Sequence, residues 1–590
     1  MQNAIAFANN DVITIAWSYG HKLPGCMGFA VYRVDAAGTE TPLPAVAVFP
    51  GMQRRKGQTT ADCPIQKFYW KDVYARLEAE KTGKRSYRYR VVPLQGKPGH
   101  LVPMNVPQVI SNAVEITPVL SQDLSAFFNR GLISTQRVSR AFKGKPAKGA
   151  LLERIAKQID PLRKSLSGDM IGALTGFLGR AKKSGSIYAA LYELGDEQLI
   201  KALEALGERL HVVLSNPKAT DAETGKNTDG NKKSRARLAK TAGELYNRML
   251  PNNQIGHNKF LVYVNAQKKP VAVLFGSTNW TSTGLCAQTN NTVVVDDAPL
   301  AARYLAYWKK LAADTKSAGK NPKALQAAPL RTADATSKHF KLTGDGGWTS
   351  WFSPNTPKLR GSNKDKEKRP PDMEEVAGLI AGAKQGVLFL AFYPGSPSIA
   401  DWAAQAQKQD KTLFVRGCVT HPSAAESFYY DLHGMTPPKK KKGVKAPPGK
   451  QDARVIAAKA LDAKSAPPGW LREILNAGFA ITHDKIVVVD PFSDASAVVT
   501  GSHNLGHKAS FNNDENLAIV RGNRKLAQAY ATHVLDVYDH FAWRFMVETK
   551  GQKKADQSLK LDPEAWQGKY FDAQGKVKVA QLRFWLSALP

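Results

Sequence analysis

Two stretches of the chain carry the same reactive residue types in the same order. Each contains His-x-Lys, then Gly-Ser-x-Asn, then one more amide or carboxylate side chain. The first copy contributes His257, Lys259, Ser277, Asn279 and Asn290, and the second contributes His483, Lys485, Ser502, Asn504 and Glu515. The step from His to Asn is 22 residues in the first copy and 21 in the second, and the last residue follows 11 positions later in both. Two complete copies form a specific signal, whereas a single His-x-Lys arises easily by chance.

These residue types suit chemistry at phosphorus. Residues two apart on a strand project from the same face, so the His and Lys of each motif point together. The glycine of Gly-Ser-x-Asn allows a tight turn that brings the carboxamide close. An imidazole can then attack phosphorus while ammonium and amide groups hold the non-bridging oxygens. The histidine of the other copy can protonate the leaving alkoxide and later activate water. The sequence therefore predicts a single site built from two halves.

The paired motifs resemble the phospholipase D superfamily over about residues 119–590. The resemblance implies a two-step reaction through a covalent phosphohistidine, with no metal ion and no other cofactor. It makes His257 the nucleophile and His483 the general acid and then the base, although the reverse assignment stays open. It also implies that the phosphoryl oxygens are bound by Lys259, Lys485, Asn279 and Asn504, with Ser277 and Ser502 in the same turns. Glu515 would orient a histidine through a ring N–H bond.

Two positions depart from the family pattern. The acidic residue five positions after the lysine is present as Asp490 in the second copy, but the first copy has Val264, followed by Asn265. The trailing acidic position of the first copy is Asn290. We count Asn290 and Asp490 among the residues that bind substrate or support the site, and we expect the two halves to play asymmetric roles.

The order of predicted elements also occurs twice. From about residue 119, helices and apolar strands alternate, which is typical of a sheet covered by helices on both faces. The first copy has a strand at 186–192, a helix at 196–206 and a strand at 210–214, and the second has them at 387–393, 398–407 and 412–415. We predict an α/β fold with two pseudo-symmetric phospholipase D-like αβα repeats that form one active site, preceded by a small β-sandwich.

The first part of the chain has a different pattern of predicted secondary structure. Alternating strands at 12–17, 29–33 and 86–93, with Trp17, Tyr87 and Tyr89, resemble a fibronectin type III-like sandwich over about the first 115 residues. A segment rich in Lys, Pro, Gly and Ser separates the two copies. The predicted domains are the sandwich at 1–118, the first half at 119–314, a linker at 315–371 and the second half at 372–590. The sandwich is expected to bind an unknown protein partner or to act as a spacer.

The charge of the chain leaves the substrate open. With 83 Lys and Arg against 50 Asp and Glu, the net charge of +33 attracts polyanions. The first hypothesis is hydrolysis or transfer of phospholipid head groups at an anionic membrane surface. Its apolar rim would come from Trp280, Phe511 and residues 170–178, although a place in the core is the expected role of each. The alternative is a nuclease whose lysine run at 439–442 grips nucleic acid, unless those lysines are merely solvated.

Other features set limits on these hypotheses. A non-catalytic binding protein would be expected to have lost a His or Lys of the motifs, and both copies retain them. The four cysteines show no Cys-x-x-Cys spacing, which argues against a zinc site or a disulfide framework. No apolar run approaches the roughly 18–20 residues of a transmembrane segment. Without a visible secretory signal we expect a cytoplasmic protein, although a protein exported by a specialised secretion system would look the same.

Overall fold

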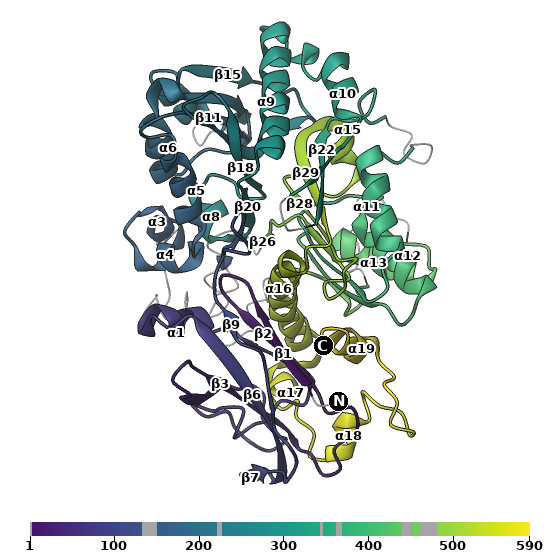
Figure 1. Cartoon of the computed structure of the whole chain (residues 1–590). Coiled ribbons are helices and arrows are strands. Elements are labelled where there is room, and N and C mark those ends of the chain that lie inside the picture. The colour runs from purple at the N-terminus through teal and green to yellow at the C-terminus, as the bar shows by residue number, and fades with distance from the viewer. Residues whose placement is uncertain are drawn as a thin grey trace.

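A computed structural model describes residues 3–131, 150–220, 227–342, 346–361, 368–438, 450–458 and 481–589. Its N-terminal part consists of two antiparallel sheets, consistent with a small β-sandwich (Figure 1). One sheet has the order β1-β2-β5, formed by Asn3–Ala8, Ile13–Ser18 and Tyr69–Asp72. The other is built around β6 (Ser86–Lys97) with β3 (Gly28–Val34), β4 (Glu40–Pro42), β7 (His100–Pro103), β8 (Val109–Ile110) and β9 (Val114–Glu115). Helix α1 (Ala75–Thr82) precedes β6. The fibronectin type III-like identity of this part stays a prediction.

The first half is a seven-stranded mixed sheet covered by helices. Its order is β10-β20-β18-β17-β11-β12-β15, in which only the β11–β12 and β12–β15 pairs are parallel. These strands are Leu124–Phe128, Asn291–Val295, Pro270–Gly276, Lys259–Val264, Ser186–Leu191, Leu210–Ser215 and Glu244–Arg248. The helices are α3 (Ala150–Ala156), α4 (Pro161–Ser167), α5 (Met170–Gly179), α6 (Glu197–Glu204), α7 (Lys232–Leu238), α8 (Ser282–Cys286) and α9 (Ala298–Ala318). A short hairpin, β13 (Lys218–Thr220) and β14 (Asn227–Asp229), follows β12.

The second half repeats this plan in a sheet of order β21-β22-β29-β28-β27-β23-β24-β25. The strands are Lys338–Lys341, Gly347–Ser353, Asn513–Arg521, Ala497–Gly501, Ile486–Val489, Gly386–Ala391, Phe414–Val419 and Val455–Ala457. Its helices are α10 (Ala328–Asp334), α11 (Pro371–Ala381), α12 (Ile399–Gln409), α13 (Pro422–His433), α15 (His507–Asn512) and α16 (Arg524–Lys550). The α/β fold with a preceding β-sandwich, which the sequence predicted, is confirmed. None of the described helices is long and apolar enough to cross a membrane.

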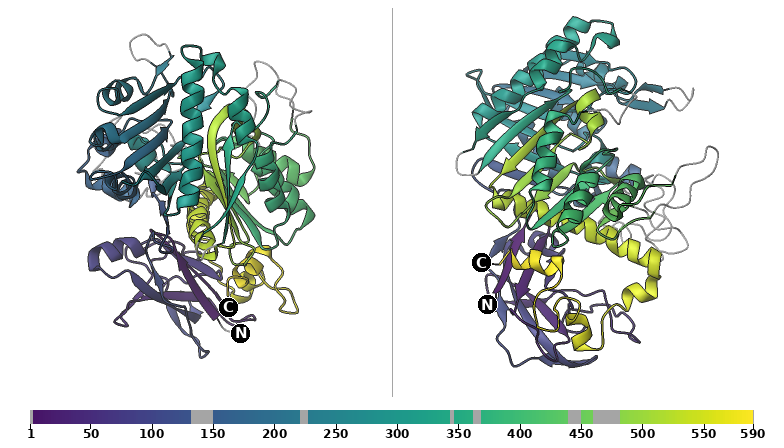
Figure 2. Two further views of the ribbon diagram at one scale, coloured as in Figure 1. Left: turned by 45° about the horizontal axis from the view of Figure 1, so that its top comes forward. Right: turned by 90° about the vertical axis from the view of Figure 1, so that its right-hand side faces the viewer.

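The long helices α9 and α16 pack between the two halves (Figure 2). On α9, Tyr304 contacts Phe275 of the first sheet and Phe352 of the second, with ring centroids 5.2 and 5.1 Å away. On α16, Tyr530 packs against Phe128 at 4.9 Å and accepts a hydrogen bond from Asn291 Nδ2 of the first sheet. Each half therefore covers its own sheet with one long helix and uses the other side of that helix to hold its partner half.

Two segments differ from the predicted domain organisation. Residues 315–371, predicted to be a linker, contain α10, β21 and β22, and β22 pairs with β29 along its whole length. The reason is tertiary packing: Trp348 and Phe352 pack in one core cluster and Trp351 in another, so both faces of β22 are covered. After α16, the helices α17 (Gln552–Asp556), α18 (Pro563–Gln567) and α19 (Ala580–Leu586) return to the N-terminal sheets.

Candidate active site

The two histidines of the motifs meet at the junction of the halves. Two short parallel strand pairs form this junction, and we call them seam one and seam two. In seam one, β16 (Ile255–Gly256) pairs with the start of β29, and His257 N donates to Asp514 O at 2.9 Å. In seam two, β19 (Gln288–Thr289) pairs with β26 (Ile481–Thr482), and His483 N donates to Thr289 O at 3.1 Å. The two imidazole centroids are 6.3 Å apart, and both side chains are buried.

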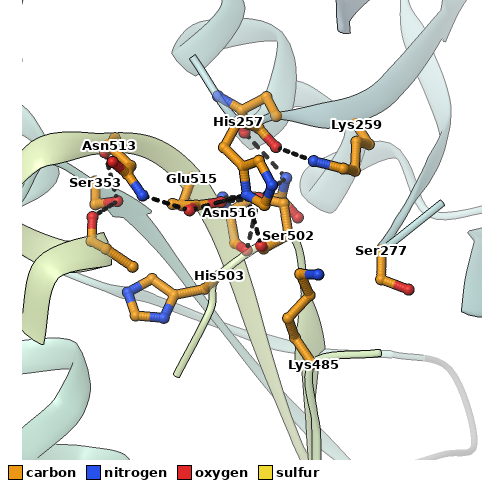
Figure 3. Close-up of polar contacts among 12 residues, drawn as sticks. His257, Lys259, Ser277, Ser353, Lys485, Ser502, His503, Asn513, Glu515 and Asn516 are labelled. Carbon is orange, nitrogen blue, oxygen red and sulfur yellow. Dashed lines mark hydrogen bonds and ion pairs between the residues drawn. The ribbon is translucent and has the colours of Figure 1, made fainter. Parts of the chain in front are cut away.

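Each imidazole is held by the trailing residue of the other copy, and Figure 3 shows this for His257 and Glu515. His257 Nδ1 lies 2.9 Å from Glu515 Oε2 and 3.1 Å from the carbonyl oxygen of Ser502. His483 Nδ1 lies 2.9 Å from Asn290 Oδ1 and 3.1 Å from the carbonyl oxygen of Ser277. A carbonyl oxygen can only accept, so Nδ1 carries the hydrogen in both rings. The neutral form of each histidine therefore has its lone pair on Nε2, the nitrogen that is available to substrate.

The serines of the Gly-Ser-x-Asn turns fix these trailing residues. Ser502 Oγ donates to Glu515 Oε2 at 2.7 Å, and Ser277 Oγ donates to Asn290 Oδ1 at 2.9 Å. Asn513 Nδ2 adds a bond to the other Glu515 oxygen at 3.1 Å. The Asn290 amide group donates to Gly284 O at 2.8 Å, which leaves its oxygen as the acceptor for His483. Each serine therefore positions a histidine indirectly, through Glu515 or Asn290.

Both lysines lie in the same buried space. Lys259 Nζ donates to His257 O at 2.7 Å, and Lys485 Nζ donates to His483 O. The two ammonium groups lie over the rings of Tyr192 and Phe392 respectively, 5.1 Å from each centroid. The same rings pack edge to face against His257 and His483, at 5.0 and 4.8 Å. Each His-x-Lys pair therefore has one aromatic residue, at the end of the neighbouring strand, that fixes both of its side chains.

The electrostatics of the site favour uncharged bases. Burial lowers the pKa of His257 to about 4 in spite of the nearby Glu515, and burial together with Lys485 and Lys259 lowers the pKa of His483. Burial also lowers the pKa of Lys259 to about 7 and lowers that of Lys485. Burial works against ionisation of Glu515, but the charge of His257 and its hydrogen bond hold the pKa of this carboxyl below its usual value. An incoming anion would stabilise the cationic forms of all four bases.

The carboxamides of Asn279 and Asn504 lie in different surroundings. Asn279 Nδ2 donates to Glu193 Oε2 at 2.6 Å, while its Oδ1 is buried without a hydrogen-bond partner. Asn504 Oδ1 is likewise buried and unpartnered. Glu193 was missed in the sequence reasoning, and so were Tyr192 and Phe392. The available signal was their position at the carboxyl ends of predicted strands, where the side chains of a site commonly gather in sheets with parallel strands.

Asp490 lies away from this group of residues. It follows β27, at the opposite end of that strand from His483, and its carboxylate accepts hydrogen bonds from the backbone N–H groups of residues 384–386 at 2.7–3.1 Å. It therefore anchors the start of β23 and does not reach the histidines. The first copy has Val264 at the matching position. This difference removes an anchor for a strand but does not remove a group from the site.

The residues considered for an apolar rim lie mostly in the hydrophobic core. Trp280 is 1% exposed, and the buried residues of α5 (Met170, Leu174, Phe177 and Leu178) belong to the main core cluster. Phe511 is half-buried. The lysine run at 439–442 lies outside the described residues.

A family model matches residues 174–312, described as the PLD-like domain of cardiolipin synthase. Residues 174–312 form a phospholipase D-like domain. The match covers the first His-x-Lys and Gly-Ser-x-Asn motif, and the resemblance predicted from the sequence is thereby confirmed. Proteins with such domains are generally enzymes of the phosphodiesterase type.

Solved structures similar to this chain include phosphatidylserine synthase from Haemophilus influenzae, with 13% identity and a TM-score of 0.40, covering 67% of this chain and 93% of that one. Nuc from Salmonella typhimurium has 19% identity and a TM-score of 0.20, covering 32% of this chain and 93% of that one. Yeast tyrosyl-DNA phosphodiesterase has 11% identity and a TM-score of 0.31, covering 60% and 88%. No curated protein sequence matches the chain.

Proposed function

We propose that the chain is a metal-independent phosphodiesterase that hydrolyses phospholipids, or transfers their phosphatidyl group, through a covalent phosphohistidine. The observation that carries the proposal is the facing pair of His257 and His483, 6.3 Å apart, each with its Nδ1 hydrogen engaged and its Nε2 available. A phosphorus atom between the two rings could be attacked from one side while its leaving oxygen receives a proton from the other.

In the first step, Nε2 of neutral His257 forms a bond to phosphorus and the bond from phosphorus to the leaving alcohol oxygen breaks. His483, protonated once the anionic substrate is bound, gives its Nε2 proton to that oxygen. In the second step, neutral His483 takes a proton from water or from an acceptor alcohol. The resulting oxygen nucleophile attacks phosphorus, the P–N bond breaks, and His257 returns to its neutral form.

The partners of the two rings favour this assignment over the reverse. Phosphorylation of His257 leaves a positive charge on its ring, which the Glu515 carboxylate at 2.9 Å stabilises. Asn290 is a neutral amide and gives the imidazolium of His483 no such support, so His483 releases its proton more readily. Lys259, Lys485, Asn279 and Asn504 are the groups we assign to the phosphoryl oxygens.

The lipid substrate rests on two further observations. The matching family model is named for cardiolipin synthase, an enzyme of phospholipids. The net charge of +33 would also draw the protein to an anionic bilayer surface. The same charge suits nucleic acid, which keeps a nuclease as the alternative.

The test compares both substrates under one set of conditions. EDTA-treated protein and a matched H257A/H483A variant are incubated in parallel with mixed phospholipid vesicles and with plasmid DNA. We expect only the unmodified protein to release ethanolamine or glycerol from the vesicles, with EDTA having no effect. Nicking of DNA by the unmodified protein alone, without lipid turnover, would contradict the lipid substrate. Activity that EDTA abolishes would contradict the metal-independent reaction.

A further inference from the structure

The site holds a second carboxyl group, Glu193, that the two-step reaction does not use. It lies two residues after the end of β11 and is half-buried, and its Oε2 accepts the 2.6 Å hydrogen bond from Asn279. Its backbone is fixed to the same turn, because Glu193 O accepts from Trp280 N at 3.1 Å and Trp280 O accepts from Gly195 N at 2.9 Å. Glu193 is therefore held in place as firmly as the Gly-Ser-x-Asn turn itself.

The charge of this carboxyl acts on both catalytic lysines. Burial raises the pKa of Glu193, while Lys259 and Lys485 both lower it, which places the carboxyl within the electrostatic reach of both ammonium groups. A carboxylate there repels any additional negative charge close to the scissile phosphate. Binding of the phosphate group alone would be better served by an uncharged side chain. The acidic group therefore calls for a positive partner on the substrate.

The corresponding place in the second half carries a different residue. Tyr192 contacts His257 and Lys259 as Phe392 contacts His483 and Lys485, so the two aromatic residues are equivalent. The next residue is Glu193 in the first half and Tyr393 in the second. Tyr393 is 50% exposed, and its ring packs against Phe392 at 4.3 Å. One side of the site thus presents a carboxylate and the other an exposed aromatic ring, so the two alcohol portions of a diester would meet different groups.

We propose that Glu193 selects phosphodiesters in which the leaving alcohol portion carries a protonated amine, as an ethanolamine head group does. The ammonium of such a group is joined to the phosphate by a short ethylene spacer. The carboxylate of Glu193 receives it while the two lysines hold the phosphoryl oxygens, so that charges of opposite sign alternate across the site. A glycerol head group in the same place offers the carboxylate no cation, and a second phosphate there is repelled by it. This inference rests on the proposed lipid reaction.

The test measures head-group preference with defined vesicles. Release of ethanolamine and of glycerol is followed for vesicles containing phosphatidylethanolamine or phosphatidylglycerol in the same neutral carrier lipid. The unmodified protein should prefer phosphatidylethanolamine by about tenfold or more in kcat/KM, the range expected for a hydrogen bond to a charged group. E193Q should lower this ratio about tenfold, and E193D should retain part of the preference because it keeps the charge. E208Q, which removes an exposed carboxyl on the surface of the first half, should leave the ratio as it is.

The outcomes separate this inference from the proposed function. Equal turnover of the two lipids by the unmodified protein, or a ratio that E193Q leaves unchanged, overturns the role of Glu193 and leaves the lipid reaction standing. An equal loss on both lipids in E193Q, with an unchanged thermal midpoint, also overturns it, because Glu193 would then only position Asn279. Turnover of neither lipid overturns the proposed function and this inference with it.

Discussion

The two halves bring nearly identical motifs to the site but give their histidines different partners. His257 faces a carboxylate, Glu515, and His483 faces a neutral amide, Asn290. Each partner is contributed by the opposite half, through the seams that join β16 to β29 and β19 to β26. A substitution in the trailing residue of one copy therefore changes the chemistry of the other copy's histidine. The role that we propose for each histidine therefore depends on the residue across the junction and not on its own motif alone.

The largest effects are expected when the two histidines are removed in turn. H257A should lower turnover by about 10⁴-fold or more, because no nucleophile remains. H483A should still attack a diester with a good leaving group, such as a p-nitrophenyl ester, but should fail to activate water. Phosphoenzyme should then accumulate on His257, where mass spectrometry after an alkaline quench can locate it. Phosphate found on His483 in the H257A variant would instead identify His483 as the nucleophile.

The two seams should differ in how much stability they contribute. In seam one, the guanidinium of the buried Arg248 makes two ion pairs. Its Nη2 lies 3.0 Å from Asp514 Oδ1, and its Nη1 lies 2.8 Å from Asp314 Oδ2. R248M leaves the buried carboxylates without their cation and should lower the free energy of unfolding by about 3–5 kcal/mol. In seam two, Thr289 and Thr482 share one long hydrogen bond of 3.4 Å. T289V should cost about 1 kcal/mol or less.

Urea denaturation of both variants measures this difference. The unmodified protein serves as the reference, and equal slopes in denaturant are needed for the comparison. Similar losses in R248M and T289V would show that the charged cluster contributes no more than the neutral seam.

A smaller catalytic effect is expected from the partner of His257. E515Q keeps the shape of the side chain but removes the charge that stabilises the phosphorylated ring, so kcat should fall about 10- to 100-fold. The matched carboxyl-to-amide change D490N alters a carboxylate that binds only backbone N–H groups at the start of β23. D490N should keep kcat within about twofold while lowering stability by about 1–3 kcal/mol. Equal losses of kcat in both variants would contradict the placement of Asp490 outside the site.

The smallest predicted effect is a shift of the pH profile. The pKa of His257 is about 4 and that of Lys259 about 7, and the reaction needs the first neutral and the second charged. In the free enzyme, kcat/KM should therefore fall below about pH 4, and its upper limb should lie at or below about pH 7, because His483 and Lys485 must also carry protons and their pKa values are lowered. K259R keeps a cation to much higher pH, because a guanidinium does not titrate in this range, so its upper limb should move upward. If the upper limb of the K259R profile stays at the same pH, a group other than Lys259 determines it.

The convergence of the motif residues could be predicted because the signal was doubled. Two matched spacings specified which side chains should converge, and the structure brings His257, His483 and their lysines together at one junction. The α/β fold followed from the alternation of helices and strands. The identity of each histidine's partner could not be read from the sequence, because it depends on which strands pair across the junction.

Other features depended on tertiary contacts that leave no local pattern. Strand β22 lies in a stretch surrounded by Lys, Pro and Gly, and only its place between two core clusters makes it a strand. Asp490 matches a family position, but its backbone partners are about 100 residues away in the sequence. Glu193 belongs to no motif, and its relevance appears only when Asn279 is seen to donate to it.

The return of the chain to its own beginning has a consequence for biosynthesis. Trp566, Tyr570 and Leu582 complete the core that contains Trp17, Phe29 and Phe68, and Trp566 Nε1 donates to Cys26 O at 2.7 Å. A ribosome makes these strands long before the side chains that cover them, since Trp566 follows Cys26 by 540 residues. The N-terminal sheets therefore wait for a distant segment to complete their core. Until residues 566–582 have been made, the aromatic residues of these sheets are uncovered on one side and open to chaperones and to aggregation.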